Sequence, residues 1–268
     1  MKKSYHTRAA FTLIELSIVL VIIGLLVGSI LGGQSLIHAS ELQSVISDFQ
    51  KYRFATKQFR DQYNALPGDM LNATSYWGVL AGTGSDSTCY NTAATGLPTC
   101  NGNGDGRVSS PDGGTSWGEY FRFWQHLSNA GFIDGTYTGV TGVLSGNDAV
   151  IGINSPKSRV RNAGWSTGHA GYADATNTLV FEGDRKQIFQ VGSRYPSRAT
   201  GGSAFRPQEA WKIDTKFDDG LPANGVVTSD KMGSAMNPNC TDSTNPTLAK
   251  YNVSNTAIAC RLMFLNQY

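Results

Sequence analysis

The sequence lacks most of the motifs that mark an enzyme. Histidine occurs only four times, and none of the four stands in the spacing that a zinc site requires. Neither a glycine-rich phosphate loop nor a dinucleotide-binding fingerprint is present. One string, Gly164-Trp-Ser166-Thr-Gly168, matches a nucleophile elbow, but the strand and helix that an elbow needs are not indicated around it, and no histidine follows His169. These absences argue against an enzyme and favour a structural or assembly role.

Charged side chains are also scarce, at 16% of the chain, whereas glycine occurs 31 times. The net charge is +2, and the first ten residues contribute three positive charges and no acid, so the remainder carries −1. This balance gives no reason to expect nucleic acid contact or an acidic surface. Low charge together with abundant glycine is typical of a loop-rich domain outside the cytoplasm.

The chain has only four cysteines, and no two of them form a CxxC pair. In an oxidising compartment an even number of this kind predicts two disulfides, for which three connectivities are possible. Local pairing of Cys89 with Cys100 and of Cys240 with Cys260 closes the shortest loops, and it is the pairing that we predict. No thiol would then remain as a nucleophile.

The longest apolar run begins at Phe11 and continues to Ile37, with Glu15 as its only ionisable side chain. The run is long enough to span a bilayer, which takes about 20 residues. A carboxylate in hydrocarbon is costly unless it is paired, so Glu15 is a functional candidate.

This run has two interpretations. In the first interpretation, the run is a secretory signal peptide or a plain signal anchor. Two features argue against it: Ile37-His38-Ala39 is a poor cleavage site, and Glu15 interrupts the apolar region. Alternatively, cleavage occurs ahead of the run, between Ala10 and Phe11. The second interpretation keeps the apolar segment in the chain and creates a free amine at Phe11, which can neutralise Glu15 of a neighbouring copy.

The residues at this position resemble a known family. Lys2-Lys3 followed by Ala10/Phe11-Thr12-Leu13-Ile14-Glu15 is similar to the leader and cleavage site of type IV prepilins and type II secretion pseudopilins. In that family the residue before the cut is usually glycine, and here it is alanine. The resemblance covers about residues 1–65.

The resemblance implies a domain organisation and a set of partners. Residues 1–10 would be the leader, 11–37 the transmembrane and filament-core half of a long helix, 38–65 its amphipathic half, and 66–268 a globular periplasmic or extracellular domain. A prepilin peptidase would cut the chain in the inner membrane and methylate Phe11, and an assembly platform would then pack it with other subunits. The size of the domain favours a minor or tip position.

Beyond the run, helical periodicity continues to the end of the resemblance. Apolar residues recur every three or four positions, and Pro67-Gly68 predicts that the helix ends near Asn64. The repeating apolar positions are Leu42, Val45, Ile46, Phe49, Tyr52, Phe59 and Tyr63. We therefore expect this half of the helix to lie against a globular domain.

A possible calcium loop follows in the segment 101–112. Asn101, Asn103, Asp105 and Asp112 supply oxygens at positions 1, 3, 5 and 12, and Gly106 stands at position 6. The backbone carbonyl of Arg107 would contribute at position 7. The segment resembles the calcium loops of EF-hands and dockerin modules, and the alternative is a turn without a metal. Asp214, Asp218 and Asp219 offer a second possible site, or a simple helix end.

The rest of the chain predicts an α+β domain. Aromatic residues at helical spacing indicate a helix from Trp117 to Leu127, and a second helix is expected over 207–217. Four short strands are expected at 149–153, 178–181, 187–191 and 225–228, in an antiparallel sheet that covers the amphipathic half of the long helix. A second functional hypothesis is therefore a membrane-anchored, calcium-dependent binding module or adhesin.

Overall fold

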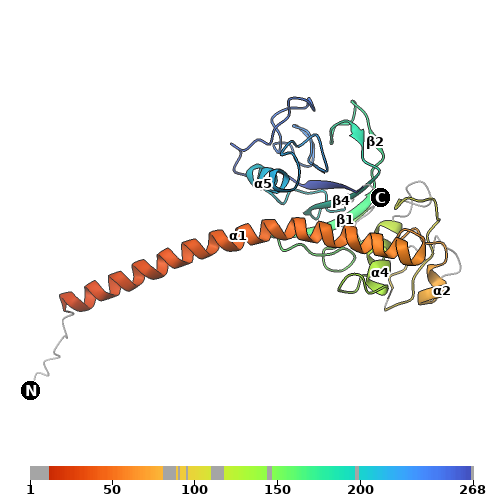
Figure 1. Ribbon diagram of the computed structural model, residues 1–268, viewed down its shortest axis with the longest axis horizontal. Helices are drawn as coiled ribbons and strands as arrows, with labels where there is room; N and C mark the ends of the chain where they lie inside the picture. The colour runs from red at the N-terminus through yellow and green to blue at the C-terminus, as the bar shows by residue number, and fades with distance from the viewer. Residues whose placement is uncertain are drawn as a thin grey trace, which may run out of the picture. The chain divides into compact units, whose positions relative to one another are not determined.

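The computed structural model describes residues 12–80, 89, 91–94, 96–109, 118–143, 147–196 and 199–266 (Figure 1). The chain divides into two compact units, residues 1–41 and residues 42–268. Helix α1, Leu13–Tyr63, contributes residues to both units.

In the first unit, α1 presents apolar side chains that nothing in the unit covers. The side chains from Leu13 to Ile37 are exposed wherever they are described, including all of the large aliphatic ones. By length and composition this helix is able to cross a membrane.

In the second unit, α1 buries one stripe, as the periodicity predicts. Val45, Phe49 and Phe59 are fully buried, and Leu42, Ile46 and Tyr52 are also in the core. The helix ends at Tyr63, where Asn64 takes a left-handed backbone conformation (φ 51°) and its N–H donates to the Arg60 carbonyl at 2.8 Å. Asparagine tolerates that conformation better than most residues, so it stops the helix before Pro67.

The buried stripe of α1 lies against a four-stranded antiparallel sheet. The strand order is β1 (Ala163–His169), β4 (Gln187–Ser193), β6 (Leu262–Asn266) and β5 (Val227–Thr228). Phe49 stacks on Phe264 with ring centroids 4.6 Å apart and meets Phe189 edge-on at 6.0 Å. Tyr52 contacts Trp165 at 5.5 Å. The fold is therefore the α+β arrangement that the sequence predicts, with a long N-terminal helix packed on an antiparallel sheet.

Two of the predicted strands are wrong. In the segment 149–153, Gly152 is left-handed (φ 85°), and the Asn154 side chain accepts the Val150 N–H at 2.7 Å, which makes a turn. In the segment 178–181, the Asn177 side chain accepts the amides of Leu179 and Val180. In both places an asparagine oxygen takes backbone amides that a strand would use.

Strand β1 was missed because its sequence is rich in small residues. Gly168 faces the ring of Tyr120, and a Cβ at this position would overlap that ring. The strand therefore needs glycine at position 168, although glycine inside a segment lowers the expectation of a strand. Strand β6 was not among the predicted strands either. The remaining elements are the short helix α2 (Ala73–Trp77) and the two-residue pair β2 (Tyr172–Ala173) and β3 (Gly183–Asp184).

Helix α4, Gly118–Asn129, has the predicted aromatic core stripe, but its polar face is buried as well. Arg122 donates to the carbonyls of Cys89 and Thr92, both at 2.8 Å. His126 accepts the Gly68 N–H at 3.0 Å through Nδ1. This face is buried because the surrounding loops have backbone groups that need hydrogen-bond partners away from water. Trp117 lies outside the described residues.

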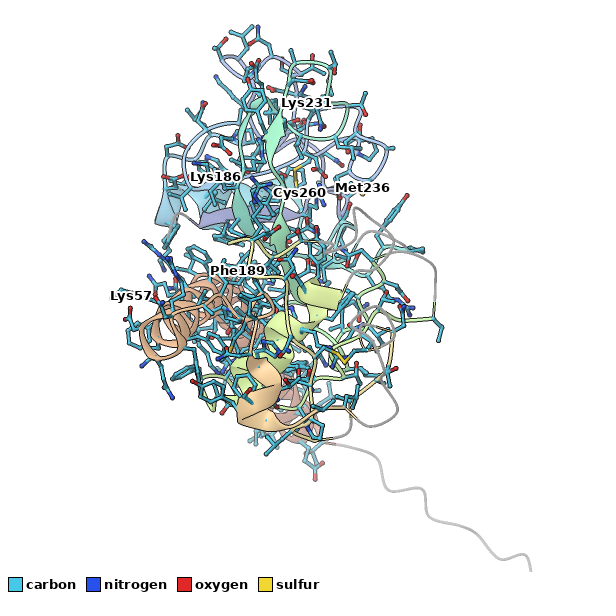
Figure 2. All side chains as sticks on the ribbon, turned by 90° about the vertical axis from the view of Figure 1, so that its right-hand side faces the viewer. Lys57, Lys186, Phe189, Lys231, Met236 and Cys260 are labelled. Carbon is cyan, nitrogen blue, oxygen red and sulfur yellow. A yellow bond between two sulfur atoms is a disulfide. The ribbon has the colours of Figure 1, made fainter. Side chains whose placement is uncertain are left out.

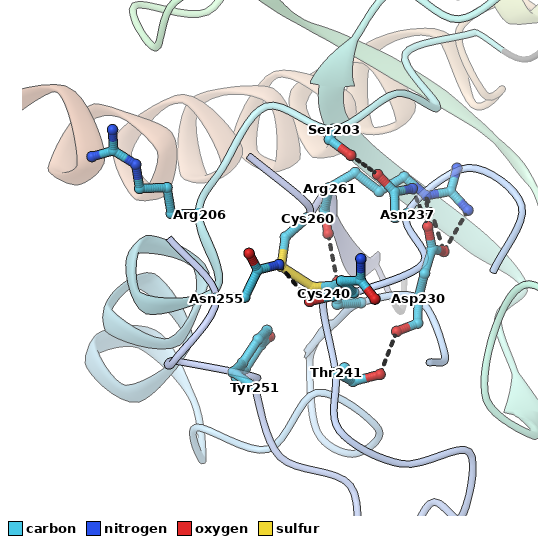
Figure 3. Close-up of a disulfide and its surroundings, with 12 residues drawn as sticks. Ser203, Arg206, Asp230, Asn237, Cys240, Thr241, Tyr251, Asn255, Cys260 and Arg261 are labelled. Carbon is cyan, nitrogen blue, oxygen red and sulfur yellow. Dashed lines mark hydrogen bonds and ion pairs between the residues drawn. A yellow bond between two sulfur atoms is a disulfide. The ribbon is translucent and has the colours of Figure 1, made fainter. Parts of the chain in front are cut away.

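Both disulfides are present, Cys89–Cys100 and Cys240–Cys260. The second lies between β5 and β6, next to a buried ion pair (Figure 3) in which Arg261 Nη2 is 2.8 Å from Asp230 Oδ1. Helix α5, Pro207–Phe217, packs beside this region and has the predicted bounds.

The packing of Phe49 gives a direct test of the fold. Replacing Phe49 with alanine should lower the free energy of unfolding of the unit 42–268 by about 3–5 kcal/mol, because a fully buried ring leaves a cavity. The measurement is urea unfolding of the full chain in neutral detergent, followed by tryptophan fluorescence. Phe54→Ala is the matched control on the same helix, since that ring is 60% exposed. Equal losses for the two variants would contradict the packing described here.

Candidate functional site

The start of α1 is the first candidate site. The Thr12 N–H and hydroxyl donate to Glu15 Oε2 at 2.8 and 2.7 Å, and the Glu15 N–H donates to Thr12 Oγ1 at 3.3 Å. This reciprocal pair is a capping box, and Thr-x-x-Glu is its sequence signature. The sequence analysis missed it, although the signal is plain in Thr12-Leu13-Ile14-Glu15. Ala10 and Phe11 lie outside the described residues.

The capping box holds one oxygen of the Glu15 carboxylate and makes no bond to the other. Oε2 accepts both bonds from Thr12, whereas Oε1 has no partner within the described part of the chain. The carboxylate is therefore held at the helix N-terminus, where the helix dipole favours negative charge. Oε1 is thus without a partner among the described residues.

The second candidate site is the loop 101–109, which follows Cys100. Gly106 is left-handed (φ 81°), as position 6 of a calcium loop requires. Asn103 Oδ1 accepts the Asp105 N–H at 3.0 Å, and Asp105 Oδ1 accepts the Arg107 N–H at 2.8 Å. These bonds curl the loop around its own polar side chains, and Val108 at position 8 is fully buried.

Two carboxylates from other elements enter this loop, and the sequence analysis missed both. Asp69, which follows α1, accepts the Asp105 N–H through Oδ1 at 3.0 Å and the Gly106 N–H through Oδ2 at 2.9 Å. Glu119, in the first turn of α4, accepts the Asn103 N–H at 3.1 Å and the Ser109 N–H at 2.9 Å. Their distance from the loop in sequence left no pattern to find. The only local hint is that Asp69 follows a Pro-Gly turn.

Burial dominates the electrostatics of these two acids. Glu119 is fully buried and Asp69 is 4% exposed, and neither makes an ion pair with a Lys or Arg in the described ranges. Loss of hydration raises the pKa of Glu119 to about 8 and that of Asp69 to about 6, and their amide hydrogen bonds offset only part of this. The nearby charge of Asp105 raises both pKa values further. Asp69 and Glu119 are therefore two buried carboxylates without a cationic partner in the described part of the chain.

The predicted ligands have different positions in this arrangement. Asn103 and Asp105 lie inside the loop. Asn101 Oδ1 instead accepts the Thr74 N–H at 2.9 Å and the Thr74 hydroxyl at 3.0 Å, at the start of α2. Arg107 is exposed, and Asp112 lies outside the described residues. Asp69 and Glu119 bind amides of the same loop, but with Asp105 they form no compact acidic cluster: among the described residues, the three carboxylates whose oxygens lie within 4.8 Å of one another are Asp214, Asp218 and Asp219.

A third group, Asp214, Asp218 and Asp219, lies where α5 ends. Their carboxylate oxygens are within 4.8 Å of one another, which is close enough to share one cation. Each carboxylate already accepts a hydrogen bond. The Tyr251 hydroxyl donates to Asp214 at 2.8 Å. The Val227 N–H donates to Asp218 at 3.0 Å, and the Leu221 N–H donates to Asp219 at 2.8 Å. The group joins the end of α5 to β5.

The possible nucleophile Ser166 is a structural residue. It lies in the middle of β1, where it pairs with Gln190 of β4, and its Oγ is 2.7 Å from Thr200 Oγ1. A nucleophile elbow needs a strand that ends at the serine and a helix that begins after it. Neither is present around Ser166.

Comparison with known proteins gives one match. Residues 5–31 match the prokaryotic N-terminal methylation motif, the prepilin-type motif that is typical of type IV pilins and pseudopilins. Proteins with this motif are generally structural and not enzymes. Among curated proteins and among solved structures, no match was found.

The buried acids predict a dependence of stability on pH in a buffer with a metal chelator. Between about pH 4.5 and pH 8 the folded chain keeps a proton on Glu119 that the unfolded chain has released, so the free energy of unfolding should fall as pH rises. Asp69 acts in the same direction up to about pH 6. Urea unfolding at several pH values between 5 and 8.5 measures the slope.

Glu119→Gln isolates the contribution of Glu119, because glutamine keeps the shape and does not titrate. The difference in unfolding free energy between Glu119→Gln and the unchanged chain should increase with pH up to about 8. A difference that is constant over this range would show that Glu119 is ionised throughout.

Proposed function

We propose that this chain is a structural subunit of a type IV pilus or a type II secretion pseudopilus, in a minor or tip position. The observation that carries the proposal is the methylation motif over residues 5–31, followed directly by an apolar helix that is long enough to span a membrane. The basic residues ahead of the run keep the N-terminus in the cytoplasm, so the unit 42–268 lies on the other side of the inner membrane.

Processing at Ala10 prepares the helix for polymerisation. A prepilin peptidase cuts before Phe11 and methylates the new amine, which leaves the apolar helix in the chain. In the sequence of the processed chain, this amine is the positive charge closest to Thr12 and Glu15. In a neighbouring subunit it lies within reach of a Glu15 carboxylate whose Oε1 has no partner of its own within the described residues.

Pairing in hydrocarbon gives this contact its selectivity. An unpaired carboxylate is unfavourable there, so a subunit is retained where its charge is neutralised. Because Thr12 already fixes Oε2, the carboxylate has a defined direction before the neighbour arrives. Glu15 and the amine of Phe11 thus set the register between successive subunits.

The proposal includes a calcium ion in the loop 101–109. The loop geometry supports it: Gly106 is left-handed at position 6, Asn103 and Asp105 stand at positions 3 and 5, and the Arg107 carbonyl stands at position 7. Asn101 Oδ1 already accepts two hydrogen bonds from Thr74, and Asp112 remains a further candidate ligand. A bound divalent cation supplies the positive charge that the buried carboxylates lack, and it ties the end of α1 to the start of α4.

A second candidate function rests on the same loop. A calcium-stabilised domain on a membrane anchor also suits a binding module or adhesin that is displayed at a filament tip. This function differs from a shaft subunit in abundance, because a tip protein is scarce in sheared filaments.

The assembly contact predicts a specific defect for Glu15→Ala. The variant should stay in the membrane and be processed, but its amount in sheared filaments should fall by about tenfold or more, because the neighbour's amine loses its partner. Immunoblots of membrane and sheared fractions measure this effect in cells that make the native filament. Mass spectrometry should find an N-terminal peptide that begins at N-methyl-Phe11.

Ser17→Ala is the matched control for Glu15→Ala, since Ser17 lies one residue past the first turn and bonds only to the Ile14 carbonyl of its own helix. Normal incorporation of Glu15→Ala would contradict the role of Glu15. A peptide that starts at Met1 would contradict processing, and dominance of sheared filaments by this protein would contradict a minor or tip position.

The calcium site predicts stabilisation by the ion alone. Calcium at about 100 times its dissociation constant should stabilise the folded unit by about 2.7 kcal/mol, and for extracellular modules this needs millimolar concentrations or more. The measurement is the melting temperature of the full chain in neutral detergent, with EDTA or with 10 mM calcium as an order-of-magnitude excess. Glu119→Gln should lose most of the increase, whereas Glu182→Gln, at an exposed site, should keep it. An unchanged melting temperature would remove the calcium proposal.

A further inference from the structure

An open groove of about 1380 Å³ lies in the second unit, between the end of α1, the loop 101–109 and the segment that leads into β4. Six of its lining residues are lysine or arginine: Arg53, Lys57, Arg60, Arg107, Arg185 and Lys186. Figure 2 shows Lys57 of α1 and Lys186 ahead of β4 on the same side of the domain. We call this feature the basic groove.

The basic groove gathers positively charged side chains on a chain whose net charge is close to zero. Its lining includes three acids, Asp61, Asp69 and Asp184, against the six cations. Residues 11–268 together carry a net charge of −1, so the rest of this region is acidic on balance. Concave surfaces of one sign focus the electrostatic field and attract ligands of the opposite sign.

The acids in the groove pair only weakly with its lysines. Asp69 accepts two loop amides, and the pairs Lys57–Asp61 (3.7 Å) and Lys186–Asp184 (3.6 Å) are between exposed side chains, where such pairs are weak. Arg53 and Arg107 make no ion pair with any described residue.

Two buried polar atoms at the groove also lack partners. Arg185 is only 3% exposed; its Nη1 donates to the Phe181 carbonyl, and its Nε has no hydrogen-bond partner in the described part of the molecule. The Nδ1 of His169, which also lines the groove, is buried without one. A buried donor without an acceptor is costly, so the Arg185 Nε would gain from an acceptor, whereas His169 Nδ1 is a donor in one tautomer and an acceptor in the other.

We propose that the basic groove binds a single strand of nucleic acid through its phosphates. Planar guanidinium groups match phosphate oxygens in bidentate geometry, and three of the exposed cations that line the groove, Arg53, Arg60 and Arg107, are arginines. Tyr172 lines the same groove with 65% of its surface exposed, which offers a ring on which a base can stack. The volume exceeds that of ordinary small-molecule pockets and suits a segment of a polymer.

A second copy of this chain is the competing occupant, and the structure favours it less. It would have to insert acidic side chains into the groove. In the described part of the chain, the one cluster of three close acids is Asp214, Asp218 and Asp219, whose carboxylates are already bonded to Tyr251 and to backbone amides. The inference does not depend on the filament role or on calcium.

The test is fluorescence anisotropy of a labelled oligothymidylate with the full chain in neutral detergent, over a range of salt concentrations. The variant Arg53→Gln/Arg107→Gln should bind more weakly, and the slope of log K against log salt should lose about 1.4, which is the loss of two single-strand phosphate contacts. Lys212→Gln/Lys250→Gln removes the same charge from exposed positions outside the groove and should leave the slope unchanged.

Two further measurements distinguish nucleic acid from other ligands that carry phosphate groups. Tyr172→Leu should weaken binding of the oligonucleotide but not of inorganic polyphosphate, which has no bases to stack. Equal effects on both probes would show a general polyanion site. Displacement of the oligonucleotide by phosphatidylglycerol in the micelles at equal phosphate would assign the groove to lipid headgroups. Either result, or equal slopes for the two double variants, would overturn the proposal.

Discussion

The packing of the second half of α1 on the antiparallel sheet is the contact on which the rest of the structure depends. Phe49 and Tyr52 meet Phe189, Phe264 and Trp165 on the inner face of the sheet. The same helix has exposed apolar side chains in its first half, so one element belongs to two environments. The stripe that begins at Leu42 is part of the main core of the globular unit, so this half of the helix is integral to that unit.

Burial of polar groups decides what the surrounding loops do. The polar face of α4 is turned inward, where Arg122 and His126 bind loop backbone. At the N-terminal end of α4, Glu119 does the same for the loop 101–109, and Asp69 approaches from the end of α1. Two segments with little secondary structure are thus held by side chains of the helices. The resulting concentration of buried carboxylate is what makes this loop a candidate cation site.

The basic groove and the carboxylate loop are neighbours with opposite electrostatics. Asp69, Gly104 and Gly106 line both, and Arg107 follows directly in the chain. A cation in the loop would neutralise Asp69 and make the groove more positive. If both proposed sites are occupied, each ligand would raise the affinity for the other, because linkage between neighbouring charges is reciprocal.

Local patterns in the sequence determined the helices and the disulfides. Periodicity gave the buried stripe of α1 and the bounds of α5, and the short loops gave the cysteine pairing. The capping box of Thr12 and Glu15 is also a local pattern, which the sequence contains although the sequence analysis missed it. Such features depend on residues that are only a few positions apart.

Only the tertiary structure decided the composition of the sites. Asp69 and Glu119 join the loop from elements on either side of it, and the groove collects cations from Arg53 to Lys186. Strand β1 was hidden because Gly168 is needed for the approach of Tyr120, a contact that no local rule expresses. A near-zero net charge likewise says nothing about where charges gather. Sequence patterns report neighbours along the chain, whereas these sites consist of neighbours in space.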